Sequence, residues 1–273
     1  MVSSSYILPF SLPQAAADIR LSCLTHEAQL HPWQLDLSSF QSVRGFAQRV
    51  MEKRRGGALD MMFLNAGIGI TDGQNALSEN GIERVFATNF VGHHLLHSLL
   101  AALLLNAKPA ARVVAIADEA HRLSFENGVA TDVPTLNSGA RKSLYAQSKL
   151  AMILWVQELT RLQGPNSTVH INSCHPGHAG TDISFGSTSM DKFRRLLPGI
   201  LRRQLFGSPQ QAALTPLYLG VHTKDVIAKN IRGKYFLPIA YEHTPHVLSQ
   251  NLTLQKAVWK FANDLVGHWN FLD

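Results

Sequence analysis

The chain has 273 residues, of which 45% are hydrophobic and 16% are charged, and its mean hydropathy is close to zero. These proportions exclude a disordered polypeptide and are typical of one globular α/β domain, since such domains often reach about 200–250 residues undivided. The net charge of +6 comes from scattered basic residues, so the sequence does not predict the clustered basic surface of a nucleic-acid-binding protein.

Cysteine usage and hydropathy exclude further classes of protein. The two cysteines, Cys23 and Cys174, have neither metal-ligand spacing nor the pattern of a disulfide framework, which indicates a reducing compartment. No apolar run reaches the eighteen or so residues that a membrane span needs, and Met1–Pro13 lacks the charged start of a signal peptide. We therefore expect a cytoplasmic protein without a membrane span.

The histidines are numerous but dispersed. His175 and His178 flank Pro176 and Gly177 with no third ligand in the sequence nearby, so the spacing does not predict a metal site. We interpret these two residues as loop histidines without a catalytic role.

From Trp33 onward, short apolar runs alternate with longer helical periods, which is typical of a parallel sheet covered on both faces. The predicted strands are residues 33–35, 61–64, 112–117, 170–175 and 234–237. The predicted helices are residues 39–53, 80–105, 143–162 and 209–219, followed by a C-terminal helix with Leu254, Val258, Phe261 and Leu265 inward. The pattern predicts one domain over residues 1–273, with an atypical segment at 1–13.

The segment before Trp33 departs from the pattern of a dinucleotide-binding fold. Such a fold begins with a strand, a glycine-rich turn and a helix, because glycines let a pyrophosphate approach the backbone amides at a helix N-terminus. Here the first glycine is Gly45, and Pro9 argues against a central strand over residues 6–12. We expect an N-terminally incomplete sheet, without its first two strands and glycine-rich loop. Either the gene product is truncated, or the protein has lost dinucleotide binding and kept the fold.

Tyr145 and Lys149 lie four residues apart on a predicted helix and therefore share one face. An ammonium roughly 4 Å from a phenol, at an effective dielectric near 20, is worth about 4 kcal/mol, or about three pKa units. The spacing predicts a phenol with a lowered pKa that exchanges protons near neutral pH.

Other motifs surround this pair in a fixed order. They are Trp33-Gln-Leu-Asp36, Asn65-Ala66-Gly67, Asn89 within residues 83–93, the strand 112–116, and Pro176-Gly177 followed by Thr181. Their order and spacing resemble the short-chain dehydrogenase/reductase family from its third strand to its C-terminus, most closely fungal members of secondary metabolism. The resemblance implies an α/β fold with a Rossmann-like doubly wound parallel sheet.

The resemblance also implies a role for each matching residue. Tyr145 is the acid/base, Lys149 is its pKa partner and a ribose ligand, and Asn89 holds a helix open around a water that relays protons to the lysine. NADP is the implied cofactor, although the glycine-rich loop is absent. Its implied ligands, besides Tyr145 and Lys149, are Asp36, Asn65, Ala66, Gly67, Pro176, Gly177 and Thr181. Residues 186–207 correspond to the substrate lid.

One position departs from the family's pattern. Relatives end the strand that matches residues 112–116 with a serine that donates a hydrogen bond to the substrate carbonyl, and the matching residue here is Asp118. An ionised carboxylate accepts hydrogen bonds and would repel the developing oxyanion. Protonation of Asp118, or a hydroxyl from Ser124, Ser138 or Ser143, would restore a donor. Asp118 could also act as a base for enolisation, elimination or cyclisation.

The function implied is an NADP-dependent oxidoreductase acting on a carbonyl or hydroxyl of a small apolar secondary-metabolite intermediate. Two alternatives stay open. One is a cofactor-independent lyase, isomerase or cyclase that uses Tyr145 and Asp118. The other is a catalytically inactive truncated homologue that forms a homodimer through the helices around Asn89 and Tyr145.

Overall fold

The computed structural model describes Ala17, Ile19, Arg20 and residues 29–69, 76–139, 141–177 and 208–270. The chain groups into two compact units, Met1–Asp36 and Leu37–Asp273. In the first unit, Ala17, Ile19 and Arg20 are helical, and residues 29–36 have no regular structure. The atypical segment 1–13, the lid 186–207 and Thr181 lie outside the described residues, so the predictions made for them stay predictions.

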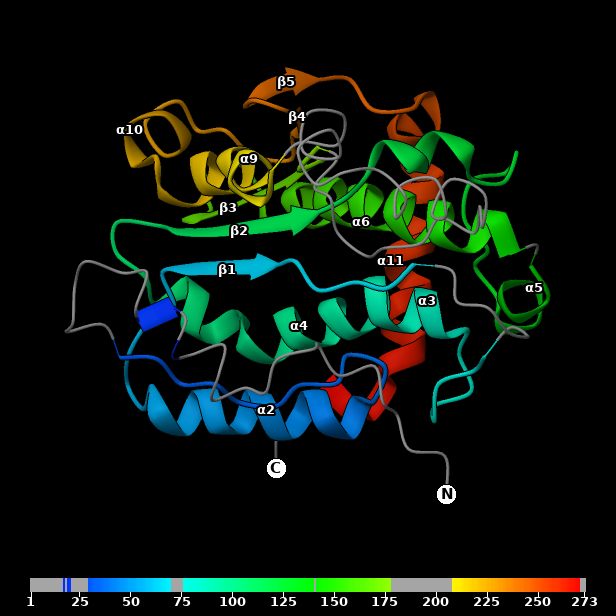
Figure 1. Ribbon diagram of the computed structural model, residues 1–273, viewed down its shortest axis with the longest axis horizontal. Coiled ribbons are helices and arrows are strands. Elements are labelled where there is room, and N and C mark those ends of the chain that lie inside the picture. Colours follow the sequence, from blue (N-terminus) through cyan, green and yellow to red (C-terminus); the bar gives the residue numbers. More distant parts are fainter. Residues whose placement is uncertain are drawn as a thin grey trace, which may run out of the picture. The chain divides into compact units, whose positions relative to one another are not determined.

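The second unit is built on a sheet with the strand order β1-β2-β3-β4-β5 (Figure 1). Strands β1 to β4 run parallel, and β5 is antiparallel to β4. Their bounds are β1 Met61–Leu64, β2 Ala111–Ile116, β3 Val169–Cys174, β4 Tyr235–Leu237 and β5 Tyr241–His243. All residues of β2 and β3 are buried, including the polar residues Arg112 of β2 and His170, Asn172 and Ser173 of β3.

Helices cover both faces of this sheet, which confirms the predicted α/β class. Neighbouring residues of β4 point to opposite faces: Tyr235 packs with Ile153 of α6 (Arg141–Gln163), and Phe236 packs with Leu219 of α9 (Pro209–Val221). On the α6 side, α2 (Phe40–Lys53) packs along α4 (Gly92–Leu105), and α11 (Leu252–Val266) packs against α6 (Figure 1).

The remaining elements are short. They are α3 Arg84–Phe86, η1 Ala87–Val91, η2 Glu119–Leu123, α5 Val133–Ser138, α10 Thr223–Val226, η3 Val247–Gln250 and η4 Gly267–Asn270.

The predicted elements and the observed ones agree at four of the five strands. The prediction of a strand at residues 33–35 is wrong, because residues 31–36 are described and contain no strand. A short apolar segment forms a strand only where a neighbouring strand completes the hydrogen-bond ladder. The local sequence pattern does not show whether such a strand is present. The expected loss of the first two strands concerns residues before 29, which are largely undescribed.

The predicted helix 80–105 begins later and contains a defect. It runs from Arg84 to Leu105, and one turn of it, η1, is π-helical around Asn89. By length and composition this helix could cross a membrane, since an 18-residue window of it has a mean hydropathy of 1.2, but 72% of that window is buried inside the fold. A core helix has the same composition, and burial identifies it as one here.

Gly92 is where α4 passes close to another backbone segment. A Cβ placed on this residue would overlap the carbonyl oxygen of Leu37, whereas a Cβ on Gly45, in the middle of α2, would meet nothing within 4 Å. Packing therefore requires glycine at position 92, whereas position 45 has room for a side chain.

We predict opposite effects of alanine at these two helical glycines. Gly92→Ala should lower the free energy of unfolding by about 1–3 kcal/mol, because overpacking exceeds the gain in helix propensity. Gly45→Ala, the matched control, should raise it by up to about 1 kcal/mol, since only propensity changes there. Urea denaturation followed by circular dichroism measures both, and a stabilised Gly92→Ala variant would contradict the close approach.

Buried histidines on α4 form a second unusual feature of the core. His94 Nδ1 accepts a hydrogen bond of 3.0 Å from Trp155 Nε1, and the ring of His97 stands edge-on to the same indole at 5.2 Å. Burial lowers the pKa of His93 and His94 to about 4 and that of His97 to about 3. All three rings are therefore neutral in the folded protein at neutral pH.

We predict that these histidines make the fold sensitive to acid. Their pKa values in the folded chain lie below the unfolded value of about 6.5, so the stability present above pH 6.5 is lost as the pH falls towards 4. Three such groups give a slope of at most about 4 kcal/mol per pH unit. Urea midpoints measured between pH 7.5 and pH 4.5 should fall less steeply for His97→Phe than for the wild type; equal slopes would contradict the prediction.

Candidate active site

Parallel pairing brings three chain segments to one edge of the sheet. Residue pairs Leu64 with Ala115 and Ile116 with Cys174 are in register, so the segments that leave β1, β2 and β3 emerge side by side. These segments carry Asn65-Ala66-Gly67, Asp118 and His175. Ligands of open α/β sheets bind at the carboxyl ends of the strands, which makes this edge the candidate active site.

Lys149 reaches this edge from α6 as a buried amine. Its Nζ donates a hydrogen bond of 2.9 Å to the carbonyl oxygen of Ile116, the last residue of β2, and lies 5.6 Å from the centre of the Tyr145 ring. Burial lowers the pKa of Lys149 to about 8, although Asp118 and Cys174 oppose that shift. The amine can therefore gain and lose a proton close to neutral pH.

Tyr145 lies one turn earlier on α6 and is also buried. Its hydroxyl donates a hydrogen bond of 3.3 Å to Asp118 Oδ2. Burial, followed by the charge and the hydrogen bond of Asp118, raises the pKa of Tyr145. The prediction of a lowered phenol pKa is wrong in this structure, because it counted only Lys149 and left out burial and the carboxylate.

Asp118, which the resemblance matches to the family's serine, follows the end of β2 as the N-cap residue of η2. Its backbone is extended, and Oδ1 accepts a hydrogen bond of 2.8 Å from Ala120 N at the start of η2. Its Oδ2 accepts from Tyr145 and lies 3.8 Å from His175 Nδ1. Of the serines considered as replacements, Ser138 donates instead to the carbonyl oxygen of Thr135 within α5. Asp118 therefore brings an acceptor, and no hydroxyl, to the end of β2.

Asn89 fixes the segment that follows β1. This fully buried side chain accepts a hydrogen bond of 2.8 Å from Ile68 N and donates to Ile68 O at 3.0 Å and to Ser148 Oγ at 3.2 Å. The π-helical turn gives Asn89 its place in the helix wall, as such turns often do at functional sites. A Cβ on Gly67 would lie 3.1 Å from Asn89 Oδ1 and 3.6 Å from Lys149 Nζ, so this glycine lets the segment approach both groups.

His93 holds the same segment from one turn later, a contact that the motifs did not indicate. Its Nε2 lies 2.8 Å from the carbonyl oxygen of Ala66, and because a carbonyl only accepts, Nε2 carries the hydrogen. Asn65 and Ala66 themselves are exposed. The sequence signal was the spacing of Asn89 and His93 at i and i+4, which places both side chains on one helix face.

His175 directly follows β3, outside regular secondary structure, as expected for a loop histidine. It is buried, and its backbone N–H donates to Phe236 O at 2.8 Å, so the ladder between β3 and β4 continues through it. Pro176 and Gly177 follow, and a Cβ on Gly177 would lie 3.1 Å from Pro238 Cγ. Asp36 belongs to the first unit and is half-buried there.

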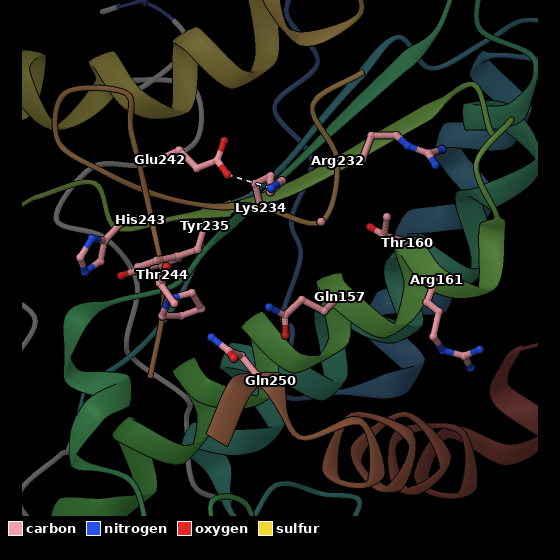
Figure 2. A pocket seen from close by; sticks show the side chains of 12 residues that line it. Gln157, Thr160, Arg161, Arg232, Lys234, Tyr235, Glu242, His243, Thr244 and Gln250 are labelled. Carbon is pink, nitrogen blue, oxygen red and sulfur yellow. Dashed lines mark ion pairs between the residues drawn. The ribbon is translucent and has the colours of Figure 1, made fainter. Parts of the chain in front are cut away.

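A cavity of about 410 Å³ lies elsewhere in the second unit, between α6 and the segments around β4 and β5 (Figure 2). Its α6 residues begin with Gln157, three turns after Tyr145, or about 18 Å along the helix. Arg232 on its wall donates to Ser167 O and Gly164 O, and Lys234 pairs with Glu242 at 2.8 Å. The lining includes none of the predicted site residues, and these charged groups are already engaged within the protein.

Comparisons with known proteins agree with the fold. The profile described as short chain dehydrogenase matches residues 11–192. Retinol dehydrogenase 13 of Mus musculus is 32% identical over 263 residues, which are 93% of this chain and 72% of the relative. The short-chain dehydrogenase/reductase drtF of Aspergillus calidoustus is 26% identical over 262 residues, which are 91% of this chain and 81% of the relative.

A solved structure shows the same likeness. The crystal structure of a short chain dehydrogenase from Burkholderia cenocepacia J2315 in complex with NADP has a TM-score of 0.51 and 26% identity, and the match covers 76% of this chain and 74% of that one. The chain thus belongs to the short-chain dehydrogenase family of oxidoreductases, and its Rossmann-like fold is confirmed.

We predict that Asp118→Asn lowers the pKa of Tyr145. The substitution removes the negative charge that disfavours a phenolate beside it, while burial continues to hold the pKa above its usual value. Alkaline titration of the phenolate absorbance, with the spectrum of Tyr145→Phe subtracted, measures the change. Asp132→Asn, at the cap of α5, is the control and should leave the Tyr145 titration in place. An unchanged titration in Asp118→Asn would contradict the contact between Tyr145 and Asp118.

Proposed function

We propose that this protein is an NADP-dependent oxidoreductase that acts on a carbonyl or hydroxyl group of a small, largely apolar secondary-metabolite intermediate in the cytoplasm. The convergence of Tyr145, Lys149 and Asn89 beside the segment 65–67 carries the proposal. Membership of the family supports it, as does the similar short chain dehydrogenase from Burkholderia cenocepacia J2315, which was solved in complex with NADP. The apolar substrate class is supported by two exposed apolar side chains. Leu123, at the end of η2, is 74% exposed, and Ile239, next to Pro238, is 65% exposed.

The residues present fit the nicotinamide and ribose end of NADP. Asn89 and His93 hold the backbone of residues 65–68 by hydrogen bonds, and this partly exposed segment lies beside the Lys149 amine. Lys149 and Tyr145 would hold the ribose, and Pro176 and Gly177 would border the nicotinamide. When bound, NADP supplies the hydride or accepts it.

The chain's own residues would handle the proton. Because its pKa is raised, Tyr145 stays protonated at neutral pH and can donate its hydrogen to a substrate oxygen. Lys149, with a pKa of about 8, lies close enough to the ring to favour the charge that develops there and to exchange a proton with solvent afterwards. Delivery of the proton requires the Tyr145 hydroxyl to leave Asp118 and turn to the substrate.

The proposal is tested by titrating the purified protein with NADPH and then adding a panel of apolar aldehydes and ketones. We expect a saturable change of NADPH fluorescence and substrate-dependent oxidation of NADPH. Tyr145→Phe should bind NADPH and lose about 10²-fold or more in kcat, since it lacks the acid. A fluorescence response that does not saturate up to about 1 mM NADPH, the upper end of the usual range of KM values, would contradict the proposal.

One observation favours a second function, proton transfer without hydride. The neutral Tyr145 hydroxyl and the Asp118 carboxylate are 3.3 Å apart, so a donor for an enolate oxygen stands beside a base for the α-proton. The same carbonyl panel, incubated in D₂O without nucleotide, should then exchange α-hydrogen for deuterium, and Asp118→Asn should abolish the exchange. Absence of both exchange and NADPH oxidation would favour an inactive homologue.

A further inference from the structure

A fully buried histidine ties the backbone of Asp118 to a distant part of the chain. His121 Nδ1 lies 2.6 Å from the carbonyl oxygen of Asp118, and its Nε2 accepts a hydrogen bond of 3.0 Å from His246 N. The ring therefore joins the segment that leaves β2 to the segment that follows β5, 125 residues further along the chain. Neither the motifs nor the family resemblance gave this histidine a role.

The two partners of His121 leave its ring only one arrangement of hydrogens. A carbonyl oxygen only accepts, so Nδ1 carries the hydrogen, and Nε2 accepts from a backbone N–H, so Nε2 is bare. Burial lowers the pKa of His121, which keeps the ring neutral in the folded protein near neutral pH. The ring of Tyr235 stands edge-on to the imidazole at 5.3 Å and packs against it. Both ring nitrogens are thus in use, each on the backbone of a different segment.

A second link between the same two segments is more exposed. Arg122 donates to the carbonyl oxygen of Thr244 at 3.2 Å and pairs with Glu119 at 2.9 Å, and the side chains of this ion pair are 36% and 35% exposed. Water competes with such contacts, so they hold a loop only weakly. Of the two links, the one through His121 is fully buried and reaches the backbone of Asp118 directly.

The backbone of Asp118 in turn sets the position of its carboxylate. Oδ1 accepts a hydrogen bond of 2.8 Å from Ala120 N, so the carboxylate moves together with the start of η2. Oδ2 accepts from the Tyr145 hydroxyl at 3.3 Å, which is longer than the usual range of about 2.5–3.0 Å. A small further displacement would therefore break this hydrogen bond. The contact by which Asp118 raises the pKa of Tyr145 thus depends on the backbone that His121 holds.

We propose that His121 is a positioning residue of the active site, which holds the backbone of Asp118 so that the carboxylate stays on the Tyr145 hydroxyl. The inference rests on the proposed function, in which Tyr145 supplies the proton. His121 acts through Asp118 and transfers no atom itself.

Two conservative variants separate the two halves of the bridge. His121→Asn places an amide nitrogen near Nδ1 and keeps a donor for Asp118, whereas His121→Gln places an amide oxygen near Nε2 and keeps an acceptor for His246 N. Both variants should be less stable in urea, since each loses one buried hydrogen bond. Only in His121→Gln should the phenolate absorbance of Tyr145 begin to rise at a lower pH than in the wild type. Equal onsets in the two variants would overturn the proposal.

The kinetic readout should divide the variants in the same way. In His121→Gln, kcat for NADPH-dependent carbonyl reduction should fall about 10–10²-fold with little change in KM, because a proton donor out of place lowers kcat. In His121→Asn, kcat should stay within about threefold of the wild type. His97→Gln, at a buried histidine of α4, is the matched control and should lower stability without moving the onset of the Tyr145 phenolate.

Coupling to Asp118 separates positioning from a general effect on the fold. In the Asp118→Asn background the negative charge beside Tyr145 is absent, so adding His121→Gln should move the phenolate onset no further, which is a strong departure from additivity. The same shift in both backgrounds would mean that His121 acts on Tyr145 by another route, and would overturn the proposal.

A measurement without substrate or cofactor checks the bridge itself. Ring ¹⁵N NMR of the wild-type protein, with the His121 signals assigned by their loss in His121→Gln, should show a hydrogen on Nδ1 and none on Nε2. The opposite tautomer would overturn the proposal. If the tautomer and the phenolate onsets are as expected but NADPH is never oxidised, the proposed function fails, while the control of Tyr145 by His121 stands.

Discussion

The chemistry of this protein depends on one shared atom, the Oδ2 oxygen of Asp118. It accepts the hydrogen of the Tyr145 phenol and lies within ion-pair distance of the His175 imidazole. A hydroxyl in the same place could donate, whereas an ionised carboxylate only accepts. Burial and the Asp118 carboxylate together raise the pKa of Tyr145, so the phenol keeps its hydrogen.

The other contacts of the site do not involve the side chain of Asp118. Lys149 is held by the carbonyl oxygen of Ile116, and Asn89 and His93 hold the backbone after β1 from one face of a single helix. These contacts are buried and use backbone partners, so they do not change with the identity of residue 118. The chain therefore matches the family although Asp118 brings an acceptor to the end of β2.

Local pattern predicted most of the fold. The strands at 61–64, 112–117 and 170–175 and the helix at 143–162 agree with the structure to within one or two residues, because buried runs and helical spacing are properties of neighbouring residues. The strand at 33–35 was wrong, since a strand needs a partner that may be far away in the chain. The direction of the Tyr145 pKa was wrong for a similar reason: Coulomb arithmetic on two residues of one helix omitted both burial and a carboxylate 27 residues away.

The sequence by itself determined the family, the α/β class and the residues that could carry chemistry, because motif order and hydrophobic period are written along the chain. It also marked Asp118 as a departure. Only the tertiary structure decided what that departure does: parallel register places Asp118 beside His175, and packing against α6 brings the phenol to the same oxygen. The physical reason is that hydrogen-bond partners and dielectric are set by groups distant in sequence and close in space, and no spacing rule along the chain contains them.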